Sequence, residues 1–135
     1  MKSAIDTRVR NKGGKAINRG RTRYCPPDSE EDCGTLTFGG SSNLKCANLK
    51  GVVLTEHDFC NVNFSGANLE KANLRDSKFY AANLKGVNLK GADLSGAWLE
   101  GANLEGADLR GACLRGAILA DANLSGVKID KRTAF

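Results

Sequence analysis

The chain has 135 residues, of which 41% are hydrophobic and 6% aromatic, and its formal net charge is +5. This is the length of one domain, and the sequence has no run of 18 apolar residues, which argues against a membrane-spanning helix. Residues 1–24 hold eight basic groups against one acidic group, whereas residues 35–135 hold 12 against 10. The basic character of the chain therefore belongs to its N-terminal segment.

Residues 1–24 are predicted to form a basic arm without stable packing, because they contain few large apolar groups and show no helical periodicity. Lys and Arg neutralise phosphates, so the arm is a candidate for electrostatic contact with RNA, DNA or an acidic protein. A solvated tail or an organelle-targeting segment is the alternative. The candidate contact residues are Arg8, Arg10, Lys12, Lys15, Arg19, Arg21 and Arg23.

Residues 25–41 are predicted to form a linker and an N-terminal cap. The segment 35–38 is expected to form a strand or a lid, because the end of a repeat stack needs cover. Cys25 and Cys33 could close a disulfide under oxidising conditions, whereas the lack of an export signal favours free thiols. The wider cysteine spacing lacks the short pairs of a zinc site.

From residue 42 to residue 131 an apolar side chain recurs at every fifth position, in 18 consecutive pentads. A small residue, most often Ala, lies two positions before each of these central residues, and Gly, Asn or Asp often lies two positions after it. The central residues are Leu44, Leu49, Leu54, Phe59, Phe64, Leu69, Leu74, Phe79, Leu84, Leu89, Leu94, Leu99, Leu104, Leu109, Leu114, Leu119, Leu124 and Ile129.

A period of five fits neither an α-helix nor a continuous β-strand. Five helical steps of about 100° advance the side chain by a net angle of about 140°, so no apolar face would form. In a strand, positions five apart point to opposite sides. A short extended segment followed by a turn in every pentad places the small and central residues inside a solenoid, and Gly, Asn and Asp suit the turns.

The units Ala67-Asn68-Leu69-Glu70-Lys71 and Ala102-Asn103-Leu104-Glu105-Gly106 resemble the A(N/D)LXX units of the pentapeptide-repeat proteins. The resemblance implies an all-β fold: a right-handed quadrilateral β-helix of about four and a half coils, here with a non-repeat N-terminal arm. It also implies four pentads per coil, so that outward residues 20 positions apart lie on one face. The fold supports different functions in different proteins, so the fold alone does not identify one.

One of the four faces departs from the polar pattern. Trp98 and Ile118 stand directly before a central residue, where most pentads have Asn or Asp, and Tyr80 lies one coil away. A contiguous exposed apolar patch often marks a protein contact, so these three residues are the candidate contact face. The alternative is that Trp98 lies flat on the coil or is covered by a terminal segment. His57 takes an inward slot and is read as a core residue.

Residues 132–135 are predicted to be a C-terminal tail, in which Phe135 either covers the last coil or leaves its end bare. A bare end would suit end-to-end homodimers, which the resemblance implies for some members. The carboxylates lie on a convex surface without a pocket, so we predict no catalytic, cofactor-binding or metal site and no enzyme activity.

The preferred function is a non-enzymatic scaffold or assembly subunit that binds a protein partner through the apolar face. One alternative, implied by the resemblance to quinolone-resistance members, is topoisomerase binding by DNA mimicry, which the near-neutral charge of residues 35–135 disfavours. Another is a nucleic-acid-associated subunit anchored by the basic arm. The predicted location is cytoplasmic, with a plastid or thylakoid-associated one as the alternative.

Overall fold

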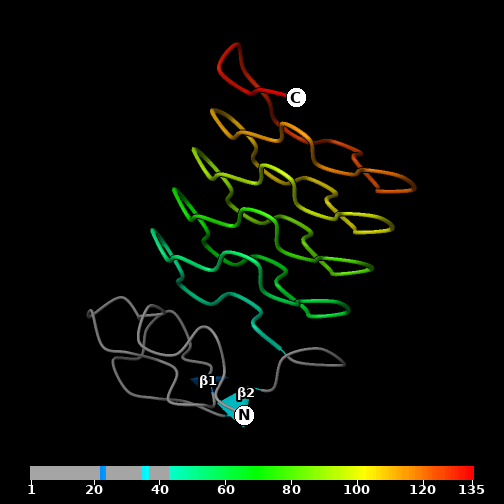
Figure 1. Ribbon diagram of the computed structural model, residues 1–135. Coiled ribbons are helices and arrows are strands. Elements are labelled where there is room, and N and C mark those ends of the chain that lie inside the picture. The colour runs from blue at the N-terminus through cyan, green and yellow to red at the C-terminus, as the bar shows by residue number, and fades with distance from the viewer. Residues whose placement is uncertain (1–21, 24–34, 37–42) are drawn as a thin grey trace.

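The computed structural model describes residues 22–23, 35–36 and 43–135, and residues 43–135 form a stack of similar coils (Figure 1). Strand β1, Thr22–Arg23, pairs antiparallel with strand β2, Thr35–Leu36, with Thr22 opposite Leu36. Strand β2 lies in the segment 35–38, for which a strand or lid is predicted. The rest of the predicted cap, including Cys25 and Cys33, lies outside the described residues.

Parallel backbone bridges between successive coils define the stack. All of these bridges except the last join a residue to the one 20 positions later, as in Asn43 to Asn63 and Asn63 to Asn83. The amide of Leu49 donates to the Asn68 carbonyl at 2.7 Å, and the Asn68 amide donates back to Ala47 at 2.8 Å. An offset of 20 residues means that one coil takes four pentads, so residues 20 apart form vertical columns on the surface.

A turn follows the central residue of each pentad and fixes the period of five. In a representative turn the Val52 amide donates to the Leu49 carbonyl at 3.2 Å, and Gly51 between them has φ of 72°. A type II turn requires positive φ at this third position. Ten glycines meet that requirement, and seven other residues adopt φ of 55–64°: Cys46, Glu56, Asn61, Lys71, Asp76, Ala81 and Asp121.

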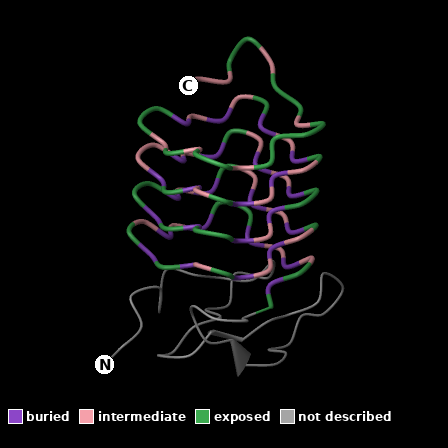
Figure 2. Cartoon of the chain, turned by 90° about the vertical axis from the view of Figure 1, so that its right-hand side faces the viewer, coloured by how far each residue is buried: buried purple, intermediate pink, exposed green. Residues whose placement is uncertain are grey.

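The central and small residues fill the interior, as the sequence predicts. Figure 2 shows buried segments turned inward along each coil and exposed segments at the corners. In the first coils the core is aromatic: the ring centroids of Phe59 and Phe79 lie 5.3 Å apart, and Phe64 contacts both. The His57 ring stacks on Phe59 with centroids 5.9 Å apart, and His57 is buried, so its predicted inward position is confirmed.

Ser77 replaces Ala in the inward slot one coil after His57, and its hydroxyl is part of a turn. The His57 amide donates to the Ser77 hydroxyl oxygen at 3.2 Å, and that hydroxyl donates to the Leu54 carbonyl. In the neighbouring turns the equivalent amide and carbonyl bond directly, as they do between Ala47 and Leu44. The Ser77 hydroxyl therefore completes a turn that holds the larger His57 side chain.

The C-terminal end changes register by one residue, because Cys113 pairs with Ala134 instead of with the residue 20 positions later. The last central residues, Leu124 and Ile129, are 36% and 53% exposed. Phe135 is 63% exposed and therefore does not cover the last coil. Within the part of the chain that the structure describes, no helix has the length and apolar character needed to cross a membrane.

The strained turn at Ala81 predicts a stabilising substitution. The left-handed conformation costs a residue with a Cβ about 1–2 kcal/mol, whereas Gly loses about 0.5–1 kcal/mol through chain entropy. We therefore expect Ala81→Gly to raise the free energy of unfolding by about 0.5–1 kcal/mol in urea denaturation. Ala120→Gly is the matched control, because Ala120 is also exposed on the same face but does not have positive φ. Ala120→Gly should lower stability, and a loss of stability in Ala81→Gly would contradict the strain argument.

The hydrogen bonds of Ser77 predict that Ala, the commonest residue in this inward slot, lowers the stability of the protein at position 77. Ser77→Ala leaves the His57 amide and the Leu54 carbonyl without their shared partner, so we expect a loss of about 1–3 kcal/mol in the free energy of unfolding. The double variant His57→Ala, Ser77→Ala restores the residue pair found elsewhere in the stack and lets the turn close directly. Non-additive losses in a double-mutant cycle would support this coupling, and independent losses would refute it.

Candidate protein-contact face

The three candidate residues Tyr80, Trp98 and Ile118 lie together on one face of the stack. A continuous column of bridges joins Lys78 to Trp98 and Trp98 to Ile118, so Trp98 and Ile118 are vertical neighbours. Tyr80 belongs to the adjoining column, two residues after Lys78. We call the surface formed by Tyr80, Trp98 and Ile118 the apolar face.

All three side chains of the apolar face are open to solvent. Tyr80 is 55% exposed, Trp98 47% and Ile118 42%, whereas the neighbouring central residues Phe79 and Leu99 are fully buried. The contrast follows from the turn geometry, which directs only the small and central residue of each pentad inward. The side chains of Tyr80, Trp98 and Ile118 therefore lie outside the apolar core.

Lys78 contributes to the face in a way that the sequence analysis missed. Its ammonium nitrogen lies 5.4 Å from the centroid of the Trp98 ring, within the range of a cation–π contact. Lys78 occupies the slot that usually holds Asn or Asp, and the 20-residue offset places it one coil from Trp98. The sequence already held a sign of this contact, because Lys78, Trp98 and Ile118 are three residues in one column that differ from the usual Asn or Asp. The contact leaves nearly half of Trp98 accessible.

A polar rim borders the apolar face on its N-terminal side. The Cys60 amide donates to Asp58 Oδ1 at 3.0 Å. A hydrogen bond with the Cys60 side chain, followed by that amide, lowers the pKa of Asp58. Burial, followed by the contact with Asp58, raises the pKa of the Cys60 thiol. Cys46, Cys60 and Cys113 are free thiols. An apolar centre with a charged margin is the usual anatomy of a protein interface.

The predicted electrostatic arm lies almost entirely outside the described residues. Only Arg23 falls within them, as the second residue of β1, while Arg8, Arg10, Lys12, Lys15, Arg19 and Arg21 do not. The structure therefore brings together the three apolar candidates and gives no placement for the basic ones.

Several charged side chains on the other faces form ion pairs, between coils or within one pentad. Lys50 lies 3.2 Å from Glu70, Lys85 lies 3.3 Å from Glu105, and within a single pentad Arg110 lies 2.6 Å from Asp108. Each pair joins groups of opposite sign, so these acidic residues do not form an unbroken negative stripe.

The pair between Asp108 and Arg110 predicts a pH-dependent part of the stability. Hydrogen bonds from the Arg110 side chain lower the pKa of Asp108 to about 2. Because the folded pKa lies below the unfolded value of about 3.9, this stabilisation is complete above pH 4 to 5 and disappears as the pH falls toward 2. Arg110 is 45% exposed, so water screens the pair and it contributes only a small part of the total stability.

The variant Asp108→Asn isolates this contribution, because Asn88 fills the equivalent slot one coil earlier and accepts the same backbone hydrogen bond. We expect the difference in unfolding free energy between wild type and variant to be largest near pH 7 and to shrink toward zero near pH 2. Asp121→Asn is the control, because Asp121 has no ion pair with a described residue. A difference that stays constant across this pH range would contradict the assignment.

Comparisons with known proteins agree with this geometry. The family model for pentapeptide repeats matches eight copies, over residues 42–79 and 88–126. The crystal structure of the pentapeptide-repeat protein Rfr23 from the cyanobacterium Cyanothece 51142 is 31% identical, with a TM-score of 0.69, and the match covers 96% of this chain and 79% of that one. No curated protein sequence matches the chain.

Two further solved structures resemble shorter parts of the chain. The pentapeptide-repeat protein alr5209 from Nostoc PCC 7120 is 36% identical over 69% of this chain and 73% of that one, with a TM-score of 0.44. QnrB1, a plasmid-mediated fluoroquinolone resistance protein, is 17% identical over 66% and 68%, with a TM-score of 0.33. The five-residue register, the 20-residue ladder and the family match agree: the chain belongs to the pentapeptide-repeat proteins and has their right-handed quadrilateral β-helix fold.

Proposed function

We propose that the chain is a non-enzymatic scaffold that binds a protein partner through the apolar face and acts as an accessory or structural subunit of a larger assembly. The observation that carries this proposal is the exposure of Tyr80, Trp98 and Ile118 as one patch on the side of the stack, apart from the exposed apolar residues of its C-terminal end. Solvent-exposed Trp and Tyr are the residue types that most often dominate the energy of a protein interface.

The shape of the fold supports a contact surface more than a reaction site. The described coils present a stack of short turns on the outside and a packed apolar interior (Figure 2). Among the described residues no group of three His, Cys, Asp or Glu side chains is arranged to hold a metal ion. We also propose that the stack has about four and a half coils, so that the apolar face has coils above and below it.

Two other contact modes remain predictions beside this one. A nucleic-acid contact would rest on the basic residues of the arm. An end-to-end homodimer would use the C-terminal end, where Ile129 and Phe135 are exposed. DNA mimicry is not favoured, because residues 35–135 hold 12 basic against 10 acidic groups and carry no strong negative charge. A cytoplasmic location, with a plastid or thylakoid-associated one as the alternative, also remains a prediction.

The test replaces Trp98 with the residue that the fold usually has at this position. In the equivalent slot Asn103 Oδ1 accepts a hydrogen bond from the Glu105 amide at 3.0 Å, so Trp98→Asn should preserve folding. Partners are captured from native lysate with tagged full-length protein, with and without nuclease. If Trp98 is an interface hot spot, Trp98→Asn should weaken binding of the main partner about thirtyfold or more.

Val53→Asn is the matched control, because it makes an apolar-to-Asn change in the same slot on another face. We expect this variant to keep the partners of the wild type. Equal recovery of partners by Trp98→Asn and the wild type would refute the apolar face as the contact. Loss of every partner after nuclease treatment would instead favour the nucleic-acid contact of the arm.

A further inference from the structure

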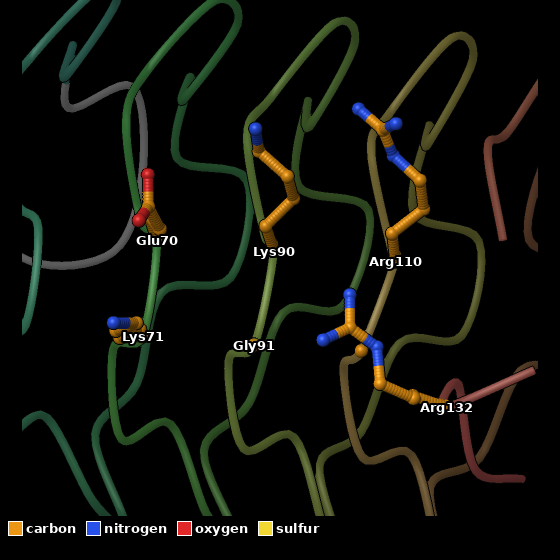
Figure 3. Close-up of a pocket in the computed structure, with 7 residues that line it drawn as sticks. Glu70, Lys71, Lys90, Gly91, Arg110 and Arg132 are labelled. Carbon is orange, nitrogen blue, oxygen red and sulfur yellow. The ribbon is translucent and has the colours of Figure 1, made fainter. Parts of the chain in front are cut away.

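A shallow groove of about 280 Å³ crosses three coils at a corner of the helix away from the apolar face (Figure 3). It lies over the turns of the column that follows Leu69, Leu89 and Leu109. Its lining residues are Glu70, Lys71, Lys90, Gly91, Arg110, Gly111 and Arg132. The lining thus combines four cationic side chains with one carboxylate.

Two glycines, Gly91 and Gly111, form the floor of the groove. Gly91 and Gly111 occupy the third turn position, with φ of 65° and 72°, in the column that holds Lys71 one coil earlier. Lys90 and Arg110 stand on one side of this glycine floor, and Arg132 reaches over it from the C-terminal segment (Figure 3). The floor therefore exposes backbone between cations that come from three different parts of the chain.

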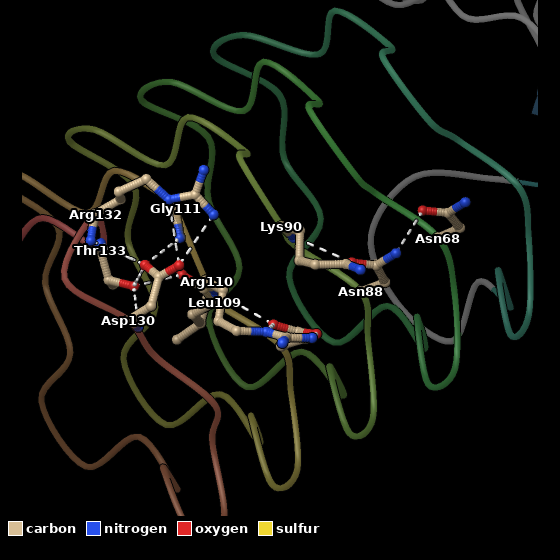
Figure 4. Close-up of polar contacts among 10 residues, drawn as sticks. Asn68, Asn88, Lys90, Leu109, Arg110, Gly111, Asp130, Arg132 and Thr133 are labelled. Carbon is tan, nitrogen blue, oxygen red and sulfur yellow. Dashed lines mark hydrogen bonds and ion pairs between the residues drawn. The ribbon is translucent and has the colours of Figure 1, made fainter.

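The C-terminal segment holds Arg132 in this position. Asp130 Oδ1 accepts hydrogen bonds from the Gly111 amide at 3.0 Å, the Arg132 amide at 2.9 Å and the Thr133 amide at 3.2 Å (Figure 4). The Thr133 hydroxyl donates to the Leu109 carbonyl at 2.9 Å. These bonds tie the segment to the coil below and coincide with the one-residue shift in register.

Both guanidinium groups are oriented by carboxylates outside the lining. Arg110 donates to Asp108 at 2.9 and 2.6 Å, and Arg132 donates to Asp130 at 3.3 and 3.1 Å. Each guanidinium has five N–H donors and uses two of them here, so three remain for a ligand. Holding an Arg in one orientation reduces the entropy that it loses when it binds an anion.

The lysines add charge that is not already paired. Lys71 and Lys90 form no ion pair with a described residue, and Glu70 is paired with Lys50 at 3.2 Å on its other side. The groove therefore offers a ligand the guanidinium groups of Arg110 and Arg132 and the ammonium groups of Lys71 and Lys90. An aromatic residue that could stack on a nucleotide base is missing from the lining.

We propose that this groove binds a phosphoryl group, held by Lys71, Lys90, Arg110 and Arg132. A guanidinium fork matches two oxygens of a phosphate, and the ammonium groups act as point charges. A phosphomonoester carries about −1.5 to −2 charge at neutral pH and three acceptor oxygens, so it fits this set of donors better than a single carboxylate does. The phosphoryl group can belong to a free phosphomonoester or to a phosphorylated side chain of a protein.

The test follows the backbone amides of Gly91 and Gly111 by NMR in the full-length protein, because these signals report on the groove and not on the basic arm. The titrants are inorganic phosphate, O-phosphoserine, a short phosphoserine peptide and the same peptide with Glu in place of phosphoserine. Sodium chloride at matched ionic strength is the reference. We expect saturable shifts with the phosphorylated titrants and weaker ones with the Glu peptide.

The variants Lys90→Gln and Arg132→Gln should each raise the dissociation constant about threefold, and the double variant about tenfold. Lys85→Gln is the control, because Lys85 occupies the same slot as Lys90 on another face, where it is exposed and pairs with Glu105. Unchanged affinity in the double variant, or an equal loss in Lys85→Gln, would overturn the proposal.

The remaining outcomes separate the two sources of the phosphoryl group. Tighter binding of the phosphopeptide than of O-phosphoserine supports a phosphorylated protein partner, whereas equal binding supports a free phosphomonoester. Shifts that sodium chloride reproduces, or amides that stay unchanged while arm signals saturate, would exclude the site. The proposal is independent of the apolar face, so Trp98→Asn should leave this binding unchanged.

Discussion

Backbone hydrogen bonding between coils is the constraint on which the rest of the structure depends. Parallel bridges join residues 20 positions apart from Asn43 up to the pair Asp108 and Lys128, and the equivalent amides and carbonyls bond in successive coils. Because each coil bonds only to its neighbours, stability is built up locally along the stack. The turn must then return the chain in five residues, which forces positive φ even on residues such as Lys71 and Ala81.

The same constraint converts the surface into columns, and function follows from departures within a column. Trp98 and Ile118 replace polar residues in one column, so two separate changes in sequence become one apolar face. In another column the C-terminal segment adds Arg132 to Lys71, Lys90 and Arg110, and together these cations border a groove over Gly91 and Gly111. A globular fold would have to bring such residues together through long-range packing, whereas this fold needs only the 20-residue offset.

The ends of the stack are where the regular pattern gives way to individual contacts. At the first coils, Ser77 completes a turn around the larger His57 side chain. At the C-terminal end the Asp130 carboxylate accepts the hydrogen bond of the Gly111 amide, whereas one coil earlier the Arg110 carbonyl accepts the equivalent bond from the Gly91 amide. These substitutions of a side chain for a backbone group preserve hydrogen bonding where the repeat is broken. The second of them also places Arg132 over the groove.

The sequence by itself determined the inward positions, the turn positions and the apolar candidates Tyr80, Trp98 and Ile118, because a period of five in unbroken register allows only one pattern of burial. It also placed Trp98 and Ile118 as vertical neighbours once four pentads per coil were taken from the family resemblance. The cation–π contact, the hydroxyl bridge of Ser77 and the position of Arg132 were decided only by the tertiary structure. The first two depend on side-chain rotamers, and the third depends on the change of register from 20 to 21 residues. The five-residue repeat determines neither the rotamers nor the change of register.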